Sequence, residues 1–297
     1  MTDKINDKVV YQGEPGANSH LACQDYFPDM ESVPCSTFED ALTAVKNGSA
    51  RLAMIPIENS VAGRVADVHH LLPDSGLYVI GEHFERICHQ LLVIPGTNIS
   101  DLKTVHSHTM ALGQCRNVIR ELGLNAVTEA DTAGAARLIK EADNKSMAAI
   151  ASSLAAEVHG LEVIRANIED AQHNTTRFLI LAAEPEDAEP EDGPIITTFI
   201  FRVRNVPAAL YKALGGFATN GVNMTKLESY QLEGTFEATM FYADIEGHPS
   251  ERPVRLALEE LSFFSNEVRI LGTYKANKFR TQLLENSPNL KLSRQRA

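Results

Sequence analysis

The chain has 297 residues, 39 of them acidic and 27 basic, which gives a formal net charge of −12. This length predicts two domains, and the acid excess argues against binding to nucleic acids or to anionic membranes. No run of about 18 apolar residues is present, and the polar N-terminal stretch lacks the apolar segment of a signal peptide. We therefore expect a cytoplasmic protein with neither a nucleic-acid nor a membrane partner.

Cysteine and histidine spacings do not indicate a metal site. The four cysteines contain no C-x-x-C pair and are expected to be free thiols. The nearest approaches to a ligand pair are His69-His70 and His106-x-His108, and neither has the spacing typical of zinc. The sequence therefore predicts neither a disulfide framework nor a bound metal.

The first 183 residues alternate short apolar runs with helical patterns. Strands are predicted at 9–12, 52–57, 78–81, 90–94, 103–107, 126–130 and 147–151. Helices are predicted near 17–26, 38–47, 61–72, 109–122, 132–142 and 152–159. This alternation favours an α/β domain with mostly parallel sheets. Because no helix separates the two strands within 77–94, we expect the chain to cross there into a second lobe, leaving a cleft between the lobes.

An acidic segment divides the chain. The stretch EPEDAEPEDG (184–193) contains six carboxylates and two prolines. We therefore expect an exposed, extended linker at residues 184–194. Residues 195–275 then read β-α-β-β-α-β, with a hairpin around Gly234. The sheet of such a unit has one helix-covered face and open edges, so self-association is expected. Residues 276–297 are predicted to be a flexible tail.

Three segments that follow predicted strands in the first part carry polar residues that suit a binding rim, because ligands bind at the carboxyl ends of strands in open α/β sheets. They lie in GEPGANSH (13–20), IENSVAG (57–63) and HSHTMALGQ (106–114), and a fourth polar segment, NTTRF (174–178), precedes an apolar strand. Asn18 or Ser19 is expected to cap the first helix, whose free N–H groups near Gly16 would seat an anion. Asn59 or Ser60 is expected to cap the second helix.

The other two segments supply further candidates. Ser107 is expected to cap the third helix and to share one face of it with Gln114. Alternation along the fourth segment places Thr176 and Phe178 on one side of a strand, and Arg177 on the other. Each of these patterns also has a purely structural interpretation, as a helix cap, an exposed polar face or a buried strand threonine.

Taken together, GEPGANSHLA, IPIENSVAGRV, the stretch from Ser107 to Gln114 and NTTRF resemble the monofunctional prephenate dehydratases, and the β-α-β-β-α-β unit that follows resembles an ACT regulatory domain. The resemblance covers residues 8–275. It implies a two-lobed catalytic domain like a periplasmic binding protein at 8–183, an acidic linker at 184–194 and a ferredoxin-like ACT domain at 195–275.

The resemblance implies an activity and roles for particular residues. Prephenate would lose water and carbon dioxide to give phenylpyruvate, without a metal or other cofactor. Thr176 would be catalytic, and the substrate would contact the following set: Gly16, Asn59, Ser60, Ser107, Gln114 and Phe178.

The resemblance also implies feedback regulation by L-phenylalanine in a homodimer or homotetramer. The effector would contact Asn205, Pro207, Ala208, Ala209, Leu210, Glu228 and Ser229. The sequence departs from the family pattern here: Ala208 stands where the family has glycine, and Tyr230-Gln231 replaces Arg-Pro. The alternative from another class is a non-catalytic sensor of small anions or amino acids, which would not need Thr176.

Overall fold

The computed structural model describes residues 7–231 and 238–286. The chain divides into two compact units, one formed by residues 1–65 and 84–178 and the other by residues 66–83 and 179–297. No helix within the described residues is long and apolar enough to span a membrane. The predicted hairpin turn at Gly234 lies outside the described residues.

The first sheet carries the amino-terminal strands. Its strand order is β2-β1-β3-β11-β5, with the short β4 paired to β3. The strands are β1 (Lys8–Gln12), β2 (Glu31–Cys35), β3 (Leu52–Asn59), β4 (Gly63–Arg64), β5 (Tyr78–Arg86) and β11 (Thr175–Ala182). Helices α1 (Asn18–Tyr26) and α2 (Phe38–Lys46) connect β1, β2 and β3, which are parallel. Apolar side chains of β1 and β3, such as Val9 and Ile55, are completely buried.

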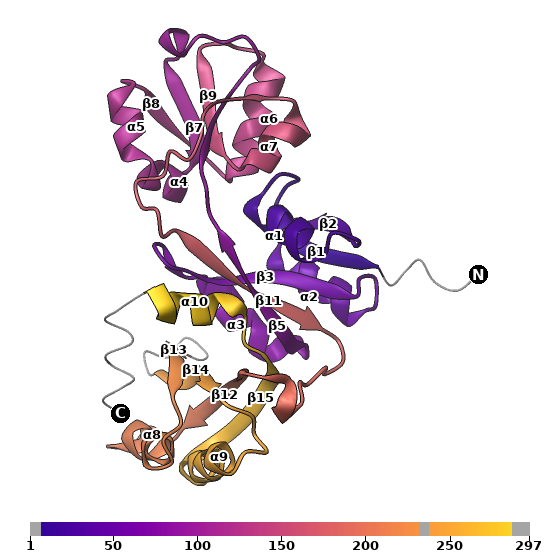
Figure 1. Ribbon diagram of the computed structural model, residues 1–297, viewed down its shortest axis with the longest axis vertical. Helices are drawn as coiled ribbons and strands as arrows, with labels where there is room; N and C mark the ends of the chain where they lie inside the picture. The colour runs from indigo at the N-terminus through magenta and orange to yellow at the C-terminus, as the bar shows by residue number, and fades with distance from the viewer. Residues whose placement is uncertain (1–6, 232–237, 287–297) are drawn as a thin grey trace, which may run out of the picture. The chain divides into compact units, whose positions relative to one another are not determined.

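The second sheet forms the other lobe of the first unit, seen in Figure 1 with helices on both sides of it. Its order is β10-β6-β9-β7-β8. The strands are β6 (Gln90–Val93), β7 (Thr104–His108), β8 (Asn125–Glu129), β9 (Met147–Ala151) and β10 (Glu162–Arg165). One face packs on α4 (Thr109–Gln114) and α5 (Arg116–Glu121), the other on α6 (Thr132–Ala142) and α7 (Ser153–His159). No helix separates β5 from β6, so the predicted crossing between lobes is confirmed.

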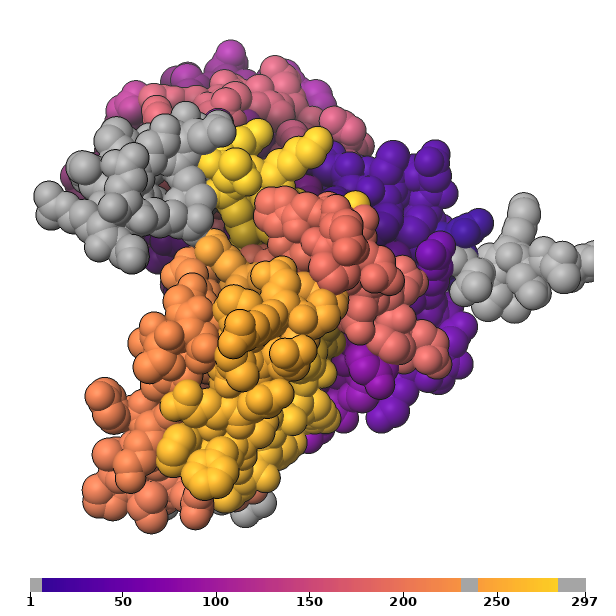
Figure 2. Space-filling model, turned by 60° about the horizontal axis from the view of Figure 1, so that its bottom comes forward, coloured from indigo at the N-terminus to yellow at the C-terminus, as the bar shows by residue number. Residues whose placement is uncertain are grey.

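The carboxyl-terminal sheet confirms the predicted β-α-β-β-α-β order. It comprises β12 (Ile195–Val203), α8 (Ala209–Thr219), β13 (Met224–Gln231), β14 (Ala238–Glu246), α9 (Arg252–Phe264) and β15 (Ser265–Lys275). The strand order is β13-β14-β12-β15, all antiparallel. Both helices share one core with the sheet, and Figure 2 shows the orange surface of α8 beside the golden surface of α9.

The sheet face opposite α8 and α9 is also covered, although the sequence predicted helices on one face only. The ring of His69, on α3 (Ala66–Ser75), contacts the ring of Tyr242 edge to face, with 5.2 Å between centroids, and His70 contacts Tyr230 in the same way. Gly272 of β15 lies so close to Val79 of β5 that a Cβ atom would overlap the Val79 carbonyl oxygen. A segment that ends at Ser75 thus covers the second face of a sheet that begins at Ile195, a pairing that no local pattern encodes.

Several predicted boundaries were wrong for identifiable reasons. The helix predicted from residue 61 begins at Ala66, because β3 continues to Asn59 and a turn with β4 follows it. The helix predicted at 109–122 is two helices with a break at Cys115. The linker segment 184–194 is exposed but includes a 3-10 turn at Pro190–Asp192.

The predicted flexible tail was also wrong in its first part. Residues Lys278–Asn286 form helix α10, and Arg280 on it pairs with the buried Glu82 of β5 through two contacts of 2.6 and 2.8 Å. A tertiary partner therefore orders a segment whose composition alone favoured an irregular tail.

Candidate functional site

A chain of side-chain hydrogen bonds in the first unit joins three of the predicted site residues. The Asn59 amide, at the end of β3, donates to Asn174 Oδ1 (2.8 Å) and to Thr176 Oγ1 (2.9 Å). Asn174 donates in turn to Gln114 Oε1 (3.0 Å), at the end of α4. Asn174 is 1% exposed and Thr176 9%, whereas Asn59 and Gln114 are half-buried. The two lobes of the unit thus meet in one polar cluster of Asn59, Gln114, Asn174 and Thr176.

The direction of these bonds is set by the backbone. Asn59 Oδ1 accepts from the N–H groups of Val61 and Ala62, at 2.9 and 2.8 Å. Its NH2 group must therefore face Asn174 and Thr176. Because the Thr176 oxygen accepts from Asn59, its hydroxyl proton is left to donate, and no described residue accepts it. Thr176 is consequently prepared to donate a hydrogen bond to a bound molecule.

Ser60 and Arg177 hold the strands that carry this network. The Ser60 hydroxyl donates to the His173 carbonyl (2.6 Å) and accepts from the Thr175 N–H (3.0 Å), so it fixes the start of β11. Arg177, 3% exposed, pairs with Glu58 Oε1 at 3.1 Å. Neighbouring residues of β3 and β11 are therefore joined alternately, Glu58 to Arg177 and Asn59 to Thr176, as expected from the side-chain alternation of strands.

Two members of the network were not among the residues that the sequence predicted for the site. Asn174 links Asn59 to Gln114, and His89, which precedes β6, contacts Gln114 Oε1 through Nε2 at 2.8 Å. His89 is 3% exposed, and burial holds the pKa of its imidazole below the ordinary value. Asn174 stands inside the NTTRF motif and could have been suspected there. His89 could not, because a single histidine beside an apolar strand is indistinguishable from a core residue.

The other predicted contact residues lie outside this network. Ser107 is completely buried within β7, and its hydroxyl donates to the Ile150 carbonyl at 2.6 Å. It does not cap a helix: His108 is the N-cap of α4, so Ser107 and Gln114 do not share a helix face. Phe178 is 1% exposed and packs in the interior.

The predicted anion seat near Gly16 is also different from expectation. Neither Asn18 nor Ser19 caps α1, because the N-cap position is Ala17, which has no side chain to accept a bond. The Gly16 N–H is already used, since it donates to His20 Nδ1 at 3.1 Å. The helix start expected at Asn59 and Ser60 is likewise absent from the described structure. The Gly16 N–H is therefore not available to seat an anion, and no helix begins at Asn59 or Ser60.

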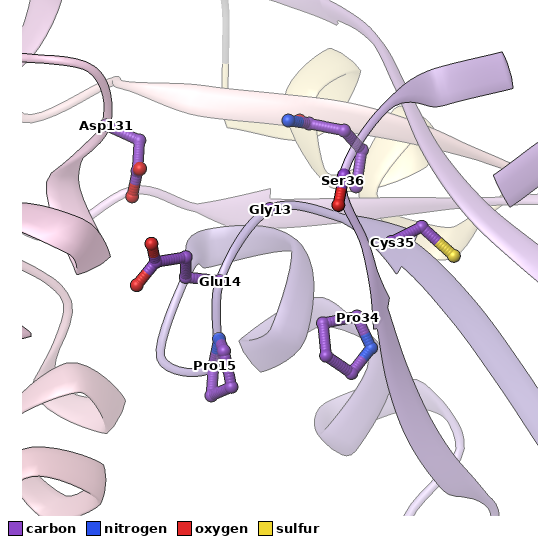
Figure 3. Close-up of a pocket in the computed structure, with 8 residues that line it drawn as sticks. Gly13, Glu14, Pro15, Pro34, Cys35, Ser36 and Asp131 are labelled. Carbon is purple, nitrogen blue, oxygen red and sulfur yellow. The ribbon is translucent and has the colours of Figure 1, made fainter. Parts of the chain in front are cut away.

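A pocket of about 410 Å³ opens beside the Gly13–Gly16 turn. It is lined by Gln12, Gly13, Glu14, Pro15, Pro34, Cys35, Ser36 and Asp131. In Figure 3 the carboxylates of Glu14 and Asp131 point into the same space from the two lobes. Two carboxylates make this space unfavourable for a dianion, although Arg137 pairs with Glu14 at 2.8 Å.

The residues predicted to bind an effector lie at two places in the second unit. Asn205 to Leu210 form the turn into α8, and Glu228 and Ser229 lie on β13. A pocket of about 170 Å³ adjoins the turn, lined by Arg204, Val206, Pro207, Ala209, Lys212 and Phe264. It combines two cationic side chains with apolar walls. No group of three potential metal ligands gathers anywhere in the described part of the chain.

Two α/β lobes joined by a buried polar cluster, with a β-α-β-β-α-β unit after them, define the class of this protein. The family model for prephenate dehydratase matches residues 9–186. The chain is 53% identical over 272 residues to a bifunctional N-acyl-homoserine lactone acylase/prephenate dehydratase of Komagataeibacter europaeus, covering 92% of this chain and 97% of that protein. It is 36% identical to arogenate dehydratase/prephenate dehydratase 1 of Arabidopsis thaliana, covering 92% and 73% of the two chains.

Solved structures agree with this assignment. Prephenate dehydratase from Arthrobacter aurescens, in complex with L-Phe, superposes with a TM-score of 0.82 at 30% identity, covering 91% of this chain and 90% of that one. A protein described as a novel type of quorum quenching acylase superposes with a TM-score of 0.87 at 53% identity, covering 92% and 99%. The chain belongs to the prephenate dehydratase family, as its sequence motifs predicted.

Proposed function

We propose that this chain converts prephenate to phenylpyruvate, with loss of water and carbon dioxide, in L-phenylalanine biosynthesis in the cytoplasm. The observation that carries the proposal is the Thr176 hydroxyl, which Asn59 orients so that its proton is free to donate. We assign residues 8–183 to catalysis and residues 195–275 to regulation.

The reaction needs little beyond orientation and a hydrogen bond. As the bond between the ring and its carboxylate breaks, the electron pair moves into the ring and expels hydroxide from C4, while carbon dioxide leaves. Aromatisation supplies the driving force. Thr176 would donate to the departing oxygen, and a threonine hydroxyl is too weak an acid to supply the full proton alone. The free NH2 group of Gln114 would donate to the substrate, because its Oε1 is occupied by Asn174 and His89.

Replacing Thr176 tests the assignment. Thr176→Val keeps the shape of the side chain and removes the donor, so we expect kcat for phenylpyruvate formation to fall roughly 10²–10⁴-fold with a smaller change in KM. Thr176→Ser keeps the donor and is the matched control. Melting temperatures must accompany the kinetics. Near-normal turnover of folded Thr176→Val would contradict the proposed role and favour the sensor alternative.

The names of relatives include two related acids, prephenate and arogenate, as substrates. We propose prephenate as the substrate. Arogenate differs by an ammonium group in place of the keto oxygen, so kcat/KM for the two compounds, measured side by side, decides between them. A higher kcat/KM for arogenate would overturn this choice and leave the dehydratase chemistry intact.

We propose that the β-α-β-β-α-β unit is an ACT domain that binds L-phenylalanine as a feedback inhibitor in a homo-oligomer. Three observations support it: the strand order, the basic and apolar pocket beside the start of α8, and the partly exposed Glu228 carboxylate on β13. The effector's carboxylate suits the cationic pocket, and its ammonium suits Glu228.

The effector proposal predicts that Glu228→Gln weakens inhibition by L-phenylalanine and leaves kcat without effector unchanged. The measurement is the inhibitor concentration at half activity, with a binding titration beside it. Glu246→Gln on β14 is the control. Equal inhibition of wild type and Glu228→Gln would place the effector elsewhere. Light scattering with and without L-phenylalanine reports the oligomeric state.

A second candidate activity is hydrolysis of N-acyl-homoserine lactones at the amide bond, which releases a fatty acid and homoserine lactone. The 53% identity to a relative named for both activities favours testing it. Released amine can be measured with wild type and with Thr176→Val. Loss of both activities in this variant would place them at one site, whereas loss of dehydration alone would separate them.

A further inference from the structure

His89 lies at the end of the hydrogen-bond chain that reaches Thr176. Its Nε2 atom is 2.8 Å from Gln114 Oε1, and no described group bonds its Nδ1, although this atom is buried. The histidine is held by its backbone: the N–H donates to Glu169 Oε2 (2.9 Å) and the carbonyl accepts from the Ile168 N–H (2.9 Å). The position of the ring is therefore fixed independently of the network.

The loop that holds His89 also holds Gln114. The Asp170 N–H donates to the Gln114 carbonyl (2.7 Å), and the Asp170 carboxylate accepts from the N–H groups of Arg116 and Asn117 at the start of α5. The break between α4 and α5, where Gln114 lies, is thus fixed by the segment that places His89. The segment 168–170 therefore holds both His89 and Gln114 in place.

The tautomer of His89 follows from the direction of the chain. Main-chain N–H groups fix the Asn59 oxygen, so Asn59 must donate to Asn174. Asn174 Oδ1 then accepts, so its NH2 group must donate to Gln114 Oε1. The Gln114 Oε1 atom is a carbonyl oxygen and cannot donate, so its contact with His89 Nε2 must be a bond that it accepts. His89 Nε2 therefore carries a proton, and a neutral ring has its lone pair on Nδ1.

We infer that His89 is a positioning residue: its Nε2–H locks the Gln114 side chain so that the Gln114 NH2 group faces the substrate. Without this donor, only the bond from Asn174 would hold Gln114 Oε1, and the amide could turn over. Burial keeps the imidazole neutral, because it lowers its pKa. The kinetic test of this inference rests on the proposed dehydratase function. The assignment of the tautomer rests on the hydrogen bonds alone.

Three substitutions separate the Nε2–H donor from simple packing. The amide nitrogen of Gln superposes on Nε2 of His, that of Asn on Nδ1, and Leu has no donor. We expect kcat/KM to stay within about threefold of wild type in His89→Gln and to fall roughly 10–100-fold in His89→Leu and His89→Asn. His106→Gln is the matched control, because this histidine is also buried (8% exposed) and hydrogen-bonded but contacts Glu129.

A double-substitution cycle shows whether His89 acts through Gln114. In the Gln114→Ala background, His89→Leu should cause no further loss beyond about twofold, because the group it positions is gone. If the decreases in kcat/KM of Gln114→Ala and His89→Leu multiply in the double variant, the inference is wrong. Equal decreases in His89→Gln and His89→Leu would also overturn it. If His89→Leu fails to fold, the comparison of His89→Gln with His89→Asn decides the matter.

The tautomer is tested without any assay of activity. Long-range 1H–15N correlation spectra of the full chain, with the His89 signals assigned by their loss in His89→Gln, should show a neutral Nε2–H ring at pH 7. An Nδ1–H ring or an imidazolium would overturn the inference. Wild type that lacks dehydratase activity but shows the Nε2–H ring would refute the proposed function and leave the positioning of Gln114 standing.

Discussion

Ala208 illustrates how a single residue departs from the pattern of its family. It is the N-cap of α8, its side chain makes no capping bond, and its φ of 63° lies in the left-handed region. A Cβ atom is unfavourable there, by about 1–2 kcal/mol, and glycine is the residue that accepts this conformation readily. The glycine that the family resemblance implies at this position would thus have a backbone explanation, and the alanine here is strained.

Ala208→Gly is expected to relieve that strain. The gain is partly offset by the greater freedom of glycine in the unfolded chain, so the free energy of unfolding should rise by about 0.5 kcal/mol. Denaturant unfolding measures it. Ala209→Gly, one residue further and inside the helix, is the control and should lower stability by about 0.5–1 kcal/mol. A loss of stability in Ala208→Gly would show that the turn does not need a left-handed residue.

At the scale of elements, α10 is attached to β5 by one buried ion pair. The Glu82 side chain is completely buried, and Arg280 binds both of its oxygens. The Asn277 N–H adds a third bond to Glu82 Oε1, at 3.1 Å. Such a pair contributes little net stability compared with apolar packing, but removal of one partner leaves a buried charge.

Arg280→Met should therefore destabilise the second unit by about 3 kcal/mol. Replacing both residues, in Glu82→Leu with Arg280→Met, should restore much of the loss. Arg255→Met is the control, because Arg255 is 56% exposed and faces Glu259 across 3.9 Å, and its loss should stay within about 0.5 kcal/mol. Unfolding curves of the four proteins give the comparison. Equal stability of Arg280→Met and wild type would mean that α10 is not held by this pair.

At the scale of the whole molecule, the two lobes of the first unit also meet through the turn after β1. Ser152 Oγ donates to the Gly16 carbonyl at 2.5 Å, and a Cβ atom at Gly16 would lie 2.7 Å from Ala155 Cα. Arg137 of α6 binds Glu14 through two nitrogens, at 2.8 and 2.9 Å. The hydrogen bond with Arg137 lowers the pKa of Glu14 below its usual range.

This ion pair predicts a pH dependence of stability. A carboxyl whose pKa is lowered on folding stabilises the folded state above its unfolded pKa, and that contribution is lost as pH falls through the folded pKa. The melting temperature of wild type should therefore exceed that of Glu14→Gln at pH 7, and the difference should vanish under acid conditions. Glu141→Gln, which removes one exposed partner of the same arginine, should show a smaller difference. A difference between wild type and Glu14→Gln that persists at the lowest pH would contradict this account.

Local chemistry determined much of this protein. Apolar runs, capping residues and glycines determined most elements of both units, because short-range preferences encode strands, helix starts and turns. The motif residues Asn59, Gln114 and Thr176, which the family resemblance implied as site residues, lie in one hydrogen-bond network. The family was identified from four motifs in order, since their combination is far more specific than any one of them.

The tertiary structure decided the contacts between distant segments. Asn174 and His89 are part of the hydrogen-bond network, whereas the side chains of Ser107 and Phe178 are buried outside it. Which side of a strand faces the other lobe decides these placements. Helix α10 is held by the ion pair between Arg280 and the buried Glu82. Helix α3 covers a sheet that begins over 100 residues later. Composition and periodicity are averages over neighbouring residues, so they specify the elements. Which polar group finds a partner depends on the packing of those elements, which only the folded chain determines.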